Sequence, residues 1–407
     1  MLASLALSLP STAGPARPRW PLALAALWLA IGYLNVARGT AHTGADYRIW
    51  AFEHHCYSDI IAMHGDRYLG GGRPLPYLED RIEYPVLLGL ALYLPSFAPG
   101  GALGHFTATY LFLALCLAVA LLALWRTRGT APWWLAATPA LVYYAGLNWD
   151  LLPIALLALS AWALERERAG ASGALAGLGI SAKLFPGTLV PPALAALGAR
   201  PPRRPLLAFA GALGAVILAV NLPLALAAPD AWSWFFRFNA TRGAENSIWD
   251  ALQVERGPLL ALLSTGPLLL ATALAGAAAF RAARAGGEAA RAVRLGTALA
   301  LVTWIATNKI WSPQYALYGF LAGALAAAPA GFFFPLAAVS VADFHVAFEV
   351  RARRWEPWFR DHVFHRDAVV RTFLWLLLAL WLGRELWRVA RAAPRAPTPG
   401  GAAPARP

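Results

Sequence analysis

Long apolar stretches recur along this chain from Trp20 to Trp387, and they limit its fold more than any other feature. A helix needs about 20 apolar residues to cross about 30 Å of hydrocarbon. Within lipid the backbone must satisfy its own hydrogen bonds, so only helices or a closed barrel can span it. The stretches are rich in Leu and Ala and do not alternate at every second residue, which excludes a barrel. Charged residues make up only 14% of the chain, too few to cover a soluble globule. The sequence therefore predicts an all-α, polytopic membrane bundle.

The apolar stretches predict about 10–13 membrane helices, some of them re-entrant or broken. Residues 84–98 are apolar but short, which favours a re-entrant or interfacial helix over a span. Residues 171–198 are interrupted near Lys183 and Pro186 and predict a broken hairpin. We expect one integral membrane domain over residues 1–388, with a long first external loop at 38–83. A disordered, basic, Pro-rich cytoplasmic tail is expected over 389–407. The remaining predicted passes are 20–37, 105–125, 131–147, 150–164, 205–228, 258–280, 295–307, 313–328, 331–350 and 368–387.

Basic residues between the spans indicate how the chain is oriented. Arg17 and Arg19 precede the first span and place the N-terminus in the cytoplasm. The cytoplasmic connectors then carry Arg, whereas His, Asp, Glu and Tyr gather on the other side. We therefore expect a multi-pass plasma-membrane protein whose active site faces the extracytoplasmic side. One segment fits poorly, because residues 351–366 hold five arginines yet fall outside. Either the last passes are shifted by one, or these arginines bind something anionic.

Two lysines are a strong signal of function. The chain has 34 Lys and Arg residues, and only Lys183 and Lys309 are lysines. Both lie in apolar stretches, each followed by an aliphatic residue and an aromatic residue, with proline at the third or fourth position. An ionisable group inside a span costs about 2.5–3.5 kcal/mol on insertion scales. Proline breaks a helix and frees carbonyl groups, which is tolerated where backbone lines a cavity. A compact ammonium suits a phosphate oxygen, so we interpret both as anion-binding; the alternative is a snorkelling lysine.

Other polar residues predicted to lie outside add to this site. Asp46, Trp50, Glu53 and Tyr57 are spaced to share one helix face, a pattern that suits sugar binding or simply a solvated interfacial helix. Asn148 and Asp150 either bind an acceptor hydroxyl or cap the next helix.

Basic and acidic groups further along the chain allow weaker interpretations. Arg237 and Arg242 lie in an aromatic external loop and could bind a lipid phosphate. Asp343, His345 and Glu349 form only a weak metal pattern, so we predict neither a metal site nor another cofactor, and metal dependence stays open.

The absence of several motifs narrows the function. The sequence has no Walker loop, GxGxxG, nucleophile elbow or HExxH. A donor for chemistry on the outer face must therefore arrive within the membrane. The net charge of +13 comes mostly from Arg between spans, so we do not expect nucleic acid as a partner.

Several short motifs, taken in order, resemble polyprenyl-phosphate-sugar-dependent glycosyltransferases of the GT-C superfamily, most closely the actinobacterial glycosyltransferase family 87. They are Asp46 in an acidic first loop, Glu83-Tyr84-Pro85, Asn148-Trp149-Asp150, Lys183-Leu184-Phe185-Pro186, and Asn308-Lys309 with Ser312-Pro313-Gln314-Tyr315. The resemblance covers about residues 46–349. It departs at Tyr84-Pro85-Val86, where the family commonly has two prolines, and in the polar segment 53–83.

The resemblance implies transfer of a hexose, typically mannose, from a polyprenyl-phosphate donor to a glycolipid or cell-envelope glycan on the outer face, with inversion at the anomeric carbon. Asp46 matches the first-loop aspartate that acts as general base. Lys183, Lys309, Arg237 and Arg242 would stabilise the leaving phosphate. Substrate-binding candidates are Trp50, Glu53, Tyr57, Tyr84, Asn148, Asp150, Asn308, Gln314 and Tyr315. The alternative is a transporter or flippase for a lipid-linked or anionic solute, which would also use broken helices.

Overall fold

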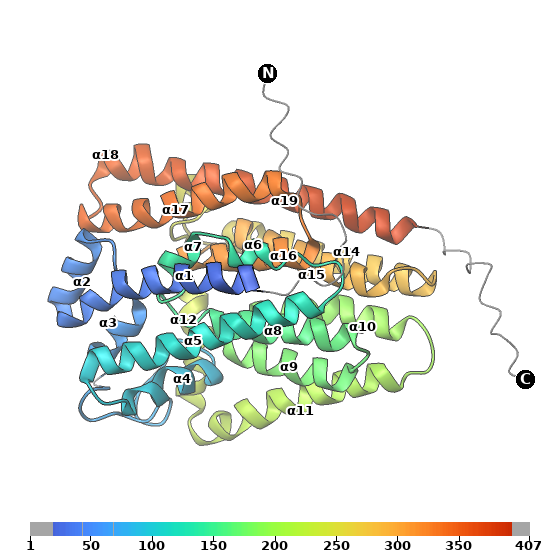
Figure 1. The fold of residues 1–407 in the computed structure, drawn as a ribbon, viewed down its shortest axis with the longest axis horizontal. Helices are drawn as coiled ribbons and strands as arrows, with labels where there is room; N and C mark the ends of the chain where they lie inside the picture. Colours follow the sequence, from blue (N-terminus) through green and yellow to red (C-terminus); the bar gives the residue numbers. More distant parts are fainter. Residues whose placement is uncertain (1–18, 43, 68, 393–407) are drawn as a thin grey trace, which may run out of the picture.

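The computed structural model describes residues 19–42, 44–67 and 69–392. It is a bundle in which most of the long helices run roughly along one common axis (Figure 1). Six helices are long and apolar enough to cross a membrane, and no strand occurs among the described residues. They are α1 (Arg19–Ala37), α5 (Gly101–Arg126), α11 (Arg204–Ala227), α14 (Pro258–Arg284), α15 (Ala289–Thr307) and α17 (Ala330–Ala352). The predicted all-α polytopic membrane bundle is confirmed.

Shorter apolar helices lie between these long ones, as expected for re-entrant and broken segments. Residues 84–98 form α4 (Val86–Tyr93) and η2 (Leu94–Phe97). The eight residues of α4 extend only about 12 Å, too little to cross a bilayer. The predicted hairpin 171–198 consists of α9 (Ala169–Ala182), η3 (Phe185–Leu189) and α10 (Val190–Gly198), and α8 (Leu151–Glu165) precedes it. The break predicted at Lys183 is therefore present.

The stretch predicted as one pass over 131–147 has a different form. It divides into α6 (Trp133–Ala136) and α7 (Ala140–Tyr144). Pro132 precedes the first of these helices and Pro139 precedes the second. A proline has no N–H to donate and its ring clashes with the preceding turn, so α7 cannot extend backwards through Pro139 into α6.

The two ends of the bundle differ in composition. One end holds the basic connectors, where Arg294 Nη1 pairs with Glu165 Oε2 at 2.6 Å. The opposite end, on the left of Figure 1, holds α2 (Gly44–Glu53), α3 (Asp59–Asp66), η1 (Arg38–Ala41), α18 (Pro357–Phe359) and η5 (Arg360–Phe364). His345 of α17 contacts His55 beside α2 at 2.7 Å, so the basic segment 351–366 lies at the same end as the first loop. The passes are therefore not shifted, and the side of the membrane that each end faces stays a prediction.

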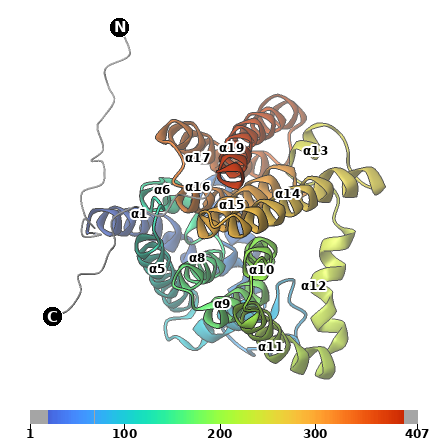
Figure 2. The same ribbon diagram turned by 90° about the vertical axis from the view of Figure 1, so that its right-hand side faces the viewer.

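The core forms around α15, which is largely buried, whereas α11 is almost entirely exposed at the periphery. η4 (Pro313–Tyr315), α16 (Ala316–Ala326) and α19 (His365–Arg391) complete the packing. Figure 2 looks along the bundle axis and shows α12 (Pro229–Thr241) running between α11 and the region of α13 (Ile248–Ala251) and α14. Because α19 continues to Arg391, the first residues of the predicted tail are helical; residues 393–407 lie outside the described part of the chain.

Candidate active site

A cavity of about 680 Å³ opens at the end of the bundle that holds the first loop. Its wall combines segments far apart in the sequence: the first loop, the start of α4, the turn before α8, the two helix breaks and one face of α12. The polar side chains of the wall that matter below are Asp59, Tyr84, Asn148, Lys183, Arg242 and Lys309. Enclosed polar groups in a mostly apolar protein are the usual setting for chemistry.

Asp59 is the acidic group at one side of the cavity. It is the first residue of α3, whose cap is Ser58, with Ser58 Oγ accepting a hydrogen bond from the Ile60 N–H at 3.1 Å. The Asp59 N–H donates to the carbonyl of Leu147 at 2.8 Å, and Asn148 Nδ2 donates to Asp59 Oδ2 at 2.8 Å. Burial raises the pKa of the Asp59 carboxyl, while hydrogen bonds from Tyr57 and Asn148 oppose the change. Asp59 is thus a carboxylate with a strengthened affinity for protons.

Tyr84 and Asn148 fix the surroundings of this carboxylate. Asn148 Nδ2 also donates to the Tyr84 hydroxyl at 2.9 Å, so one amide group connects Asp59 with the start of α4. Tyr84 follows the short loop in which Glu83 pairs with Arg67. The acidic side of the cavity is therefore held by three segments at once.

The first helix break contains Lys183, and its charge is already compensated. Lys183 has an extended backbone and ends α9. Its ammonium pairs with Asp150, which is fully buried and also accepts a hydrogen bond from the Tyr318 hydroxyl. Lys183 lies 5.7 Å from the centre of the Tyr84 ring. A buried carboxylate needs such a partner, so we interpret Lys183 as the cation that compensates the charge of Asp150.

The second break contains Lys309, whose surroundings differ. The chain leaves α15 at Thr307 and pairs with the segment after α12: the Glu245 N–H donates to the Lys309 carbonyl, and the Trp311 N–H donates to the Glu245 carbonyl, both at 2.9 Å. Lys309 Nζ donates only to backbone carbonyls, those of Arg242 at 2.6 Å and Ala240 at 3.4 Å. Burial, and then the nearby Arg242, lower the pKa of Lys309.

All but two of the described charged side chains that line the cavity form ion pairs. Arg48 pairs with Asp66, Arg242 pairs with Glu245, and the pairs of Lys183 and Glu83 are given above. Within residues 19–42, 44–67 and 69–392, Asp59 and Lys309 are the charged groups of the cavity wall that have no ion-pair partner. One carboxylate and one ammonium thus remain free to act on a bound molecule.

The structure gathers most of the predicted site residues at this cavity. Nine line it: Tyr57, Tyr84, Asn148, Lys183, Arg242, Asn308, Lys309, Gln314 and Tyr315. Asp150 lies directly behind the wall as the partner of Lys183.

Apart from Asp150, four predicted residues do not line the cavity. Helix α2 buries Tyr47 and Ala51, so Asp46 and Glu53 are exposed on its other side. Trp50 stacks with His42 and His54, at centroid distances of 4.2 and 4.3 Å. Arg237 is exposed and pairs with Asp230 at 3.3 Å.

Asp59, Arg48 and Glu245 are cavity residues that sequence reasoning did not select. Asp59 had a recognisable signal, since Ser58-Asp59 before two isoleucines is a helix N-terminus. For Arg48 and Glu245 the sequence holds no comparable signal. Among the described residues no group of three His, Cys, Asp or Glu side chains could hold a metal ion. His345 and Glu349 instead contact His55, at 2.7 and 3.3 Å.

Fold and site define an all-helical membrane protein with a charged cavity at one end of its bundle. Residues 84–307, more than half of the chain, match the model of glycosyltransferase family 87, and the protein belongs to this family. It is therefore a membrane glycosyltransferase. No curated protein matches the sequence. The matched region includes Asn148, Lys183 and Arg242, whereas Asp59 precedes it and Lys309 follows it.

Proposed function

We propose that the protein transfers a hexose, with mannose the first sugar to test, from a polyprenyl-phosphate donor to a glycolipid or cell-envelope glycan on the outer face of the plasma membrane. The observation that carries this proposal is the pair of uncompensated charges, Asp59 and Lys309, on the wall of one cavity. Sugar transfer from a phosphate needs a base for the acceptor and a cation for the leaving group. The cavity supplies one of each.

Asp59 takes the role that the sequence resemblance assigned to Asp46. The acceptor oxygen forms a bond to the anomeric carbon from the side opposite the phosphate, and its proton passes to the Asp59 carboxylate. The bond from the anomeric carbon to the phosphate oxygen breaks with inversion, and its electron pair leaves with the phosphate. The raised pKa of Asp59 makes it a stronger base than an exposed carboxylate. Asp46 is exposed on α2, where no wall of the cavity would bring it to the acceptor.

Lys309 stabilises the phosphate as it leaves. Its ammonium has no carboxylate partner, so it can give its full charge to a phosphate oxygen. Arg242 is adjacent but forms two hydrogen bonds to Glu245, one of them 2.9 Å long, and therefore contributes less charge. Asn308 and Tyr315 lie on the same wall and are in place to contact the sugar.

The apolar part of the cavity suits a lipid donor. Phe235, Phe236 and Phe238 of α12 line it together with Leu184 at the first break. Phe236 and Leu184 are also 47% and 51% exposed, so the same surface reaches the outside of the bundle. A donor carrying a long hydrocarbon chain would bury that chain here, at about 25 cal/mol per Å² of apolar surface removed from water.

The proposed orientation follows from the two ends of the bundle. Arg126, Arg200, Arg203, Arg284, Arg291 and Arg388 belong to the end away from the cavity. Short basic connectors favour the cytoplasm, which leaves the cavity end outside.

The test is reconstitution of the purified protein with a membrane lipid extract and a panel of donors. The panel contains polyprenyl-phosphate mannose, other polyprenyl-phosphate hexoses and the matching nucleotide sugars. We expect a glycosylated product only with a lipid-linked donor, with inverted anomeric configuration. Transfer from a nucleotide sugar alone, or no transfer from any lipid-linked hexose, would contradict the proposal.

A further inference from the structure

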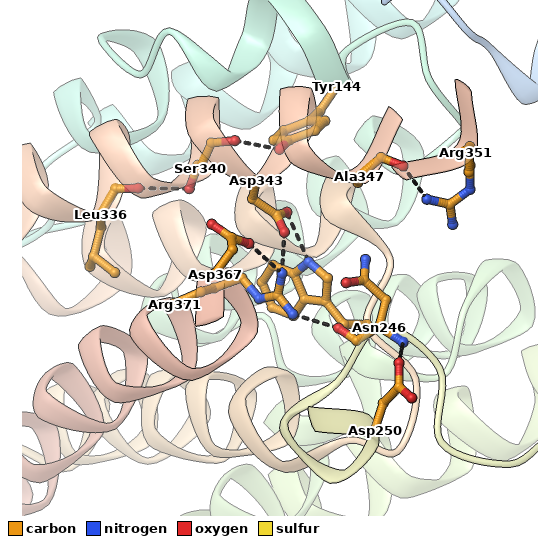
Figure 3. A network of polar contacts seen from close by, with 11 residues as sticks. Tyr144, Asn246, Asp250, Leu336, Ser340, Asp343, Ala347, Arg351, Asp367 and Arg371 are labelled. Atoms are coloured by element: carbon orange, nitrogen blue, oxygen red, sulfur yellow. Dashed lines mark hydrogen bonds and ion pairs between the residues drawn. The ribbon is translucent and has the colours of Figure 1, made fainter. Parts of the chain in front are cut away.

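A buried ionic network joins α17 and α19 to the second helix break, and its charged residues lie outside the region that matches the family (Figure 3). Arg371 of α19 pairs with Asp343 of α17, and both side chains are about 1% exposed. Arg371 also contacts Asp367, one turn earlier in α19, at 3.1 Å. The cavity wall includes none of these three residues.

Two contacts extend this network to the segments that carry Lys309. Arg371 Nη2 donates to the carbonyl of Asn246 at 2.5 Å. Trp311 Nε1 donates to Asp343 Oδ2 at 2.9 Å, and the Arg371 guanidinium lies 4.2 Å from the centre of the Trp311 ring. Asn246 and Trp311 are therefore both fixed by the same ion pair, and both are buried.

These two residues flank the backbone that holds Lys309. Asn246 follows Glu245, and Glu245 exchanges backbone hydrogen bonds with Lys309 and Trp311, each 2.9 Å long. The Lys309 ammonium in turn rests on the carbonyl of Arg242, on the same strand-like segment. A shift of Trp311 or Asn246 would thus move the ammonium, because only backbone carbonyls hold it in place.

We propose that Arg371 and Asp343 are positioning residues, which act through Trp311 and Asn246 to hold Lys309 where the donor phosphate leaves. The inference rests on the proposed role of Lys309. The buried, hydrogen-bonded ion pair suits this purpose because it fixes its partners in direction as well as distance.

The first variant is Trp311→Phe, which keeps an aromatic ring at this position and the Arg371–Asp343 pair but removes the hydrogen bond to Asp343. We expect the KM for the donor to rise about tenfold, the change expected when one hydrogen bond to a charged group is lost. The KM for the acceptor should not change. Arg371→Lys should act in the same direction, since lysine keeps the charge but cannot reach Asp343 and Asn246 together.

The matched control is Trp134→Phe. Trp134 is also fully buried, and its Nε1 donates to the carbonyl of Ala328 at 2.9 Å, but it belongs to α6, outside the cavity wall. A similar loss of thermal stability in both Trp variants, with a raised donor KM only for Trp311→Phe, supports positioning. Equal donor KM values in the two variants would overturn it.

A double-mutant cycle shows whether the effect passes through the lysine. In the Lys309→Met background, Trp311→Phe should leave the donor KM unchanged, because the group it positions is gone. A full tenfold effect in that background would contradict the inference. Binding of polyprenyl phosphate by the wild-type protein distinguishes failure of the proposed function from failure of the positioning role of Arg371 and Asp343. Absence of that binding removes the proposed function, and the inference with it. Normal wild-type binding with unchanged affinity in Trp311→Phe removes the inference alone.

Discussion

The two helix breaks are alike in sequence, but the lysine in each has different contacts. Each has a lysine followed by an aliphatic and an aromatic residue, with a proline at the third or fourth position, and each borders the same cavity. At the first break the ammonium of Lys183 is committed to the buried carboxylate of Asp150. At the second break Lys309 contacts only backbone carbonyls. The first lysine therefore stabilises the fold around the cavity, and the second is available to a ligand.

The carboxylates of the cavity follow the same division. Asp150 is buried and compensated, whereas Asp59 is open to the cavity and has no ion-pair partner within the described residues. Uncompensated charge near low-dielectric surroundings is costly, so its presence at two places on one wall indicates function. The predictions below test this division between paired and unpaired groups.

The largest effect is expected for Asp59→Asn, which removes the unpaired carboxylate while keeping its shape. Loss of a general base should lower the rate of sugar transfer by about 10²–10⁴-fold. Transfer of labelled sugar by the reconstituted protein is the measurement. Asp46→Asn is the matched control and should retain wild-type activity, because Asp46 is exposed outside the cavity. The reverse result, with Asp46→Asn inactive and Asp59→Asn active, would return the role of base to Asp46.

The next effect concerns stability and the paired lysine. Lys183→Met leaves Asp150 buried without its cation, which should cost about 3–5 kcal/mol of folding free energy. Thermal unfolding in detergent measures it, and the additional change Asp150→Asn should restore part of the loss. The free energy of unfolding of Lys309→Met should lie within about 0.5 kcal/mol of the wild-type value, as is usual for a side chain with no buried partner. Equal losses for the two lysines would abolish the distinction between the breaks.

A smaller effect is expected on the catalytic efficiency of the Lys309→Met variant. Loss of one charge-assisted contact to the leaving phosphate should lower kcat/KM for the donor by about 10- to 100-fold. The kinetics of donor and acceptor must be measured separately, and the acceptor KM should stay unchanged. Lys309→Arg, which keeps the charge, should recover part of the rate. A loss confined to the acceptor KM would place the phosphate elsewhere.

The smallest effect is a pH dependence of stability from Asp59. Its pKa is raised in the folded protein, so folding favours the protonated form. The stability that this group contributes is complete below the unfolded pKa of about 4 and is lost as pH rises through the folded value. The melting temperature of Asp59→Asn, relative to that of the wild type, should therefore rise as pH increases from 4 to neutral. A gain that shrinks over that range would show that the carboxylate is stabilised in its charged form.

The sequence was sufficient to locate most of the long helices because apolar length and proline position are local properties. It located α5, α11 and α14, the break at Lys183 and the short α4. It did not reveal that 131–147 divides at Pro139, because the apolar composition continues across the division. It also placed segment 351–366 on the cavity side while leaving a shifted pass open, which the contact between His55 and His345 resolves.

The charges of the site were harder to interpret from sequence than their positions. Lys183 and Lys309 were recognised together, but only the packing of α9 against α8 brings Asp150 to one of them and not the other. Asp46 was assigned as the base because it matches the first-loop aspartate of the family and shares a helical spacing with Trp50 and Glu53, and Asp59 was not selected. The buried face of α2 proved to be the one with Tyr47 and Ala51, so that spacing carried no information about the cavity.

A structure of the protein with polyprenyl phosphate bound is the most direct test of the account. In that structure we expect the phosphate within hydrogen-bonding distance of Lys309 Nζ and the hydrocarbon chain along Phe235 and Phe236 of α12. We also expect Lys183 to remain paired with Asp150. A phosphate bound to Lys183 in place of Asp150 would contradict the division between the two breaks. A phosphate at the opposite end of the bundle, in the cavity of about 520 Å³ beside Arg291 and Arg388, would contradict the assignment of the active site.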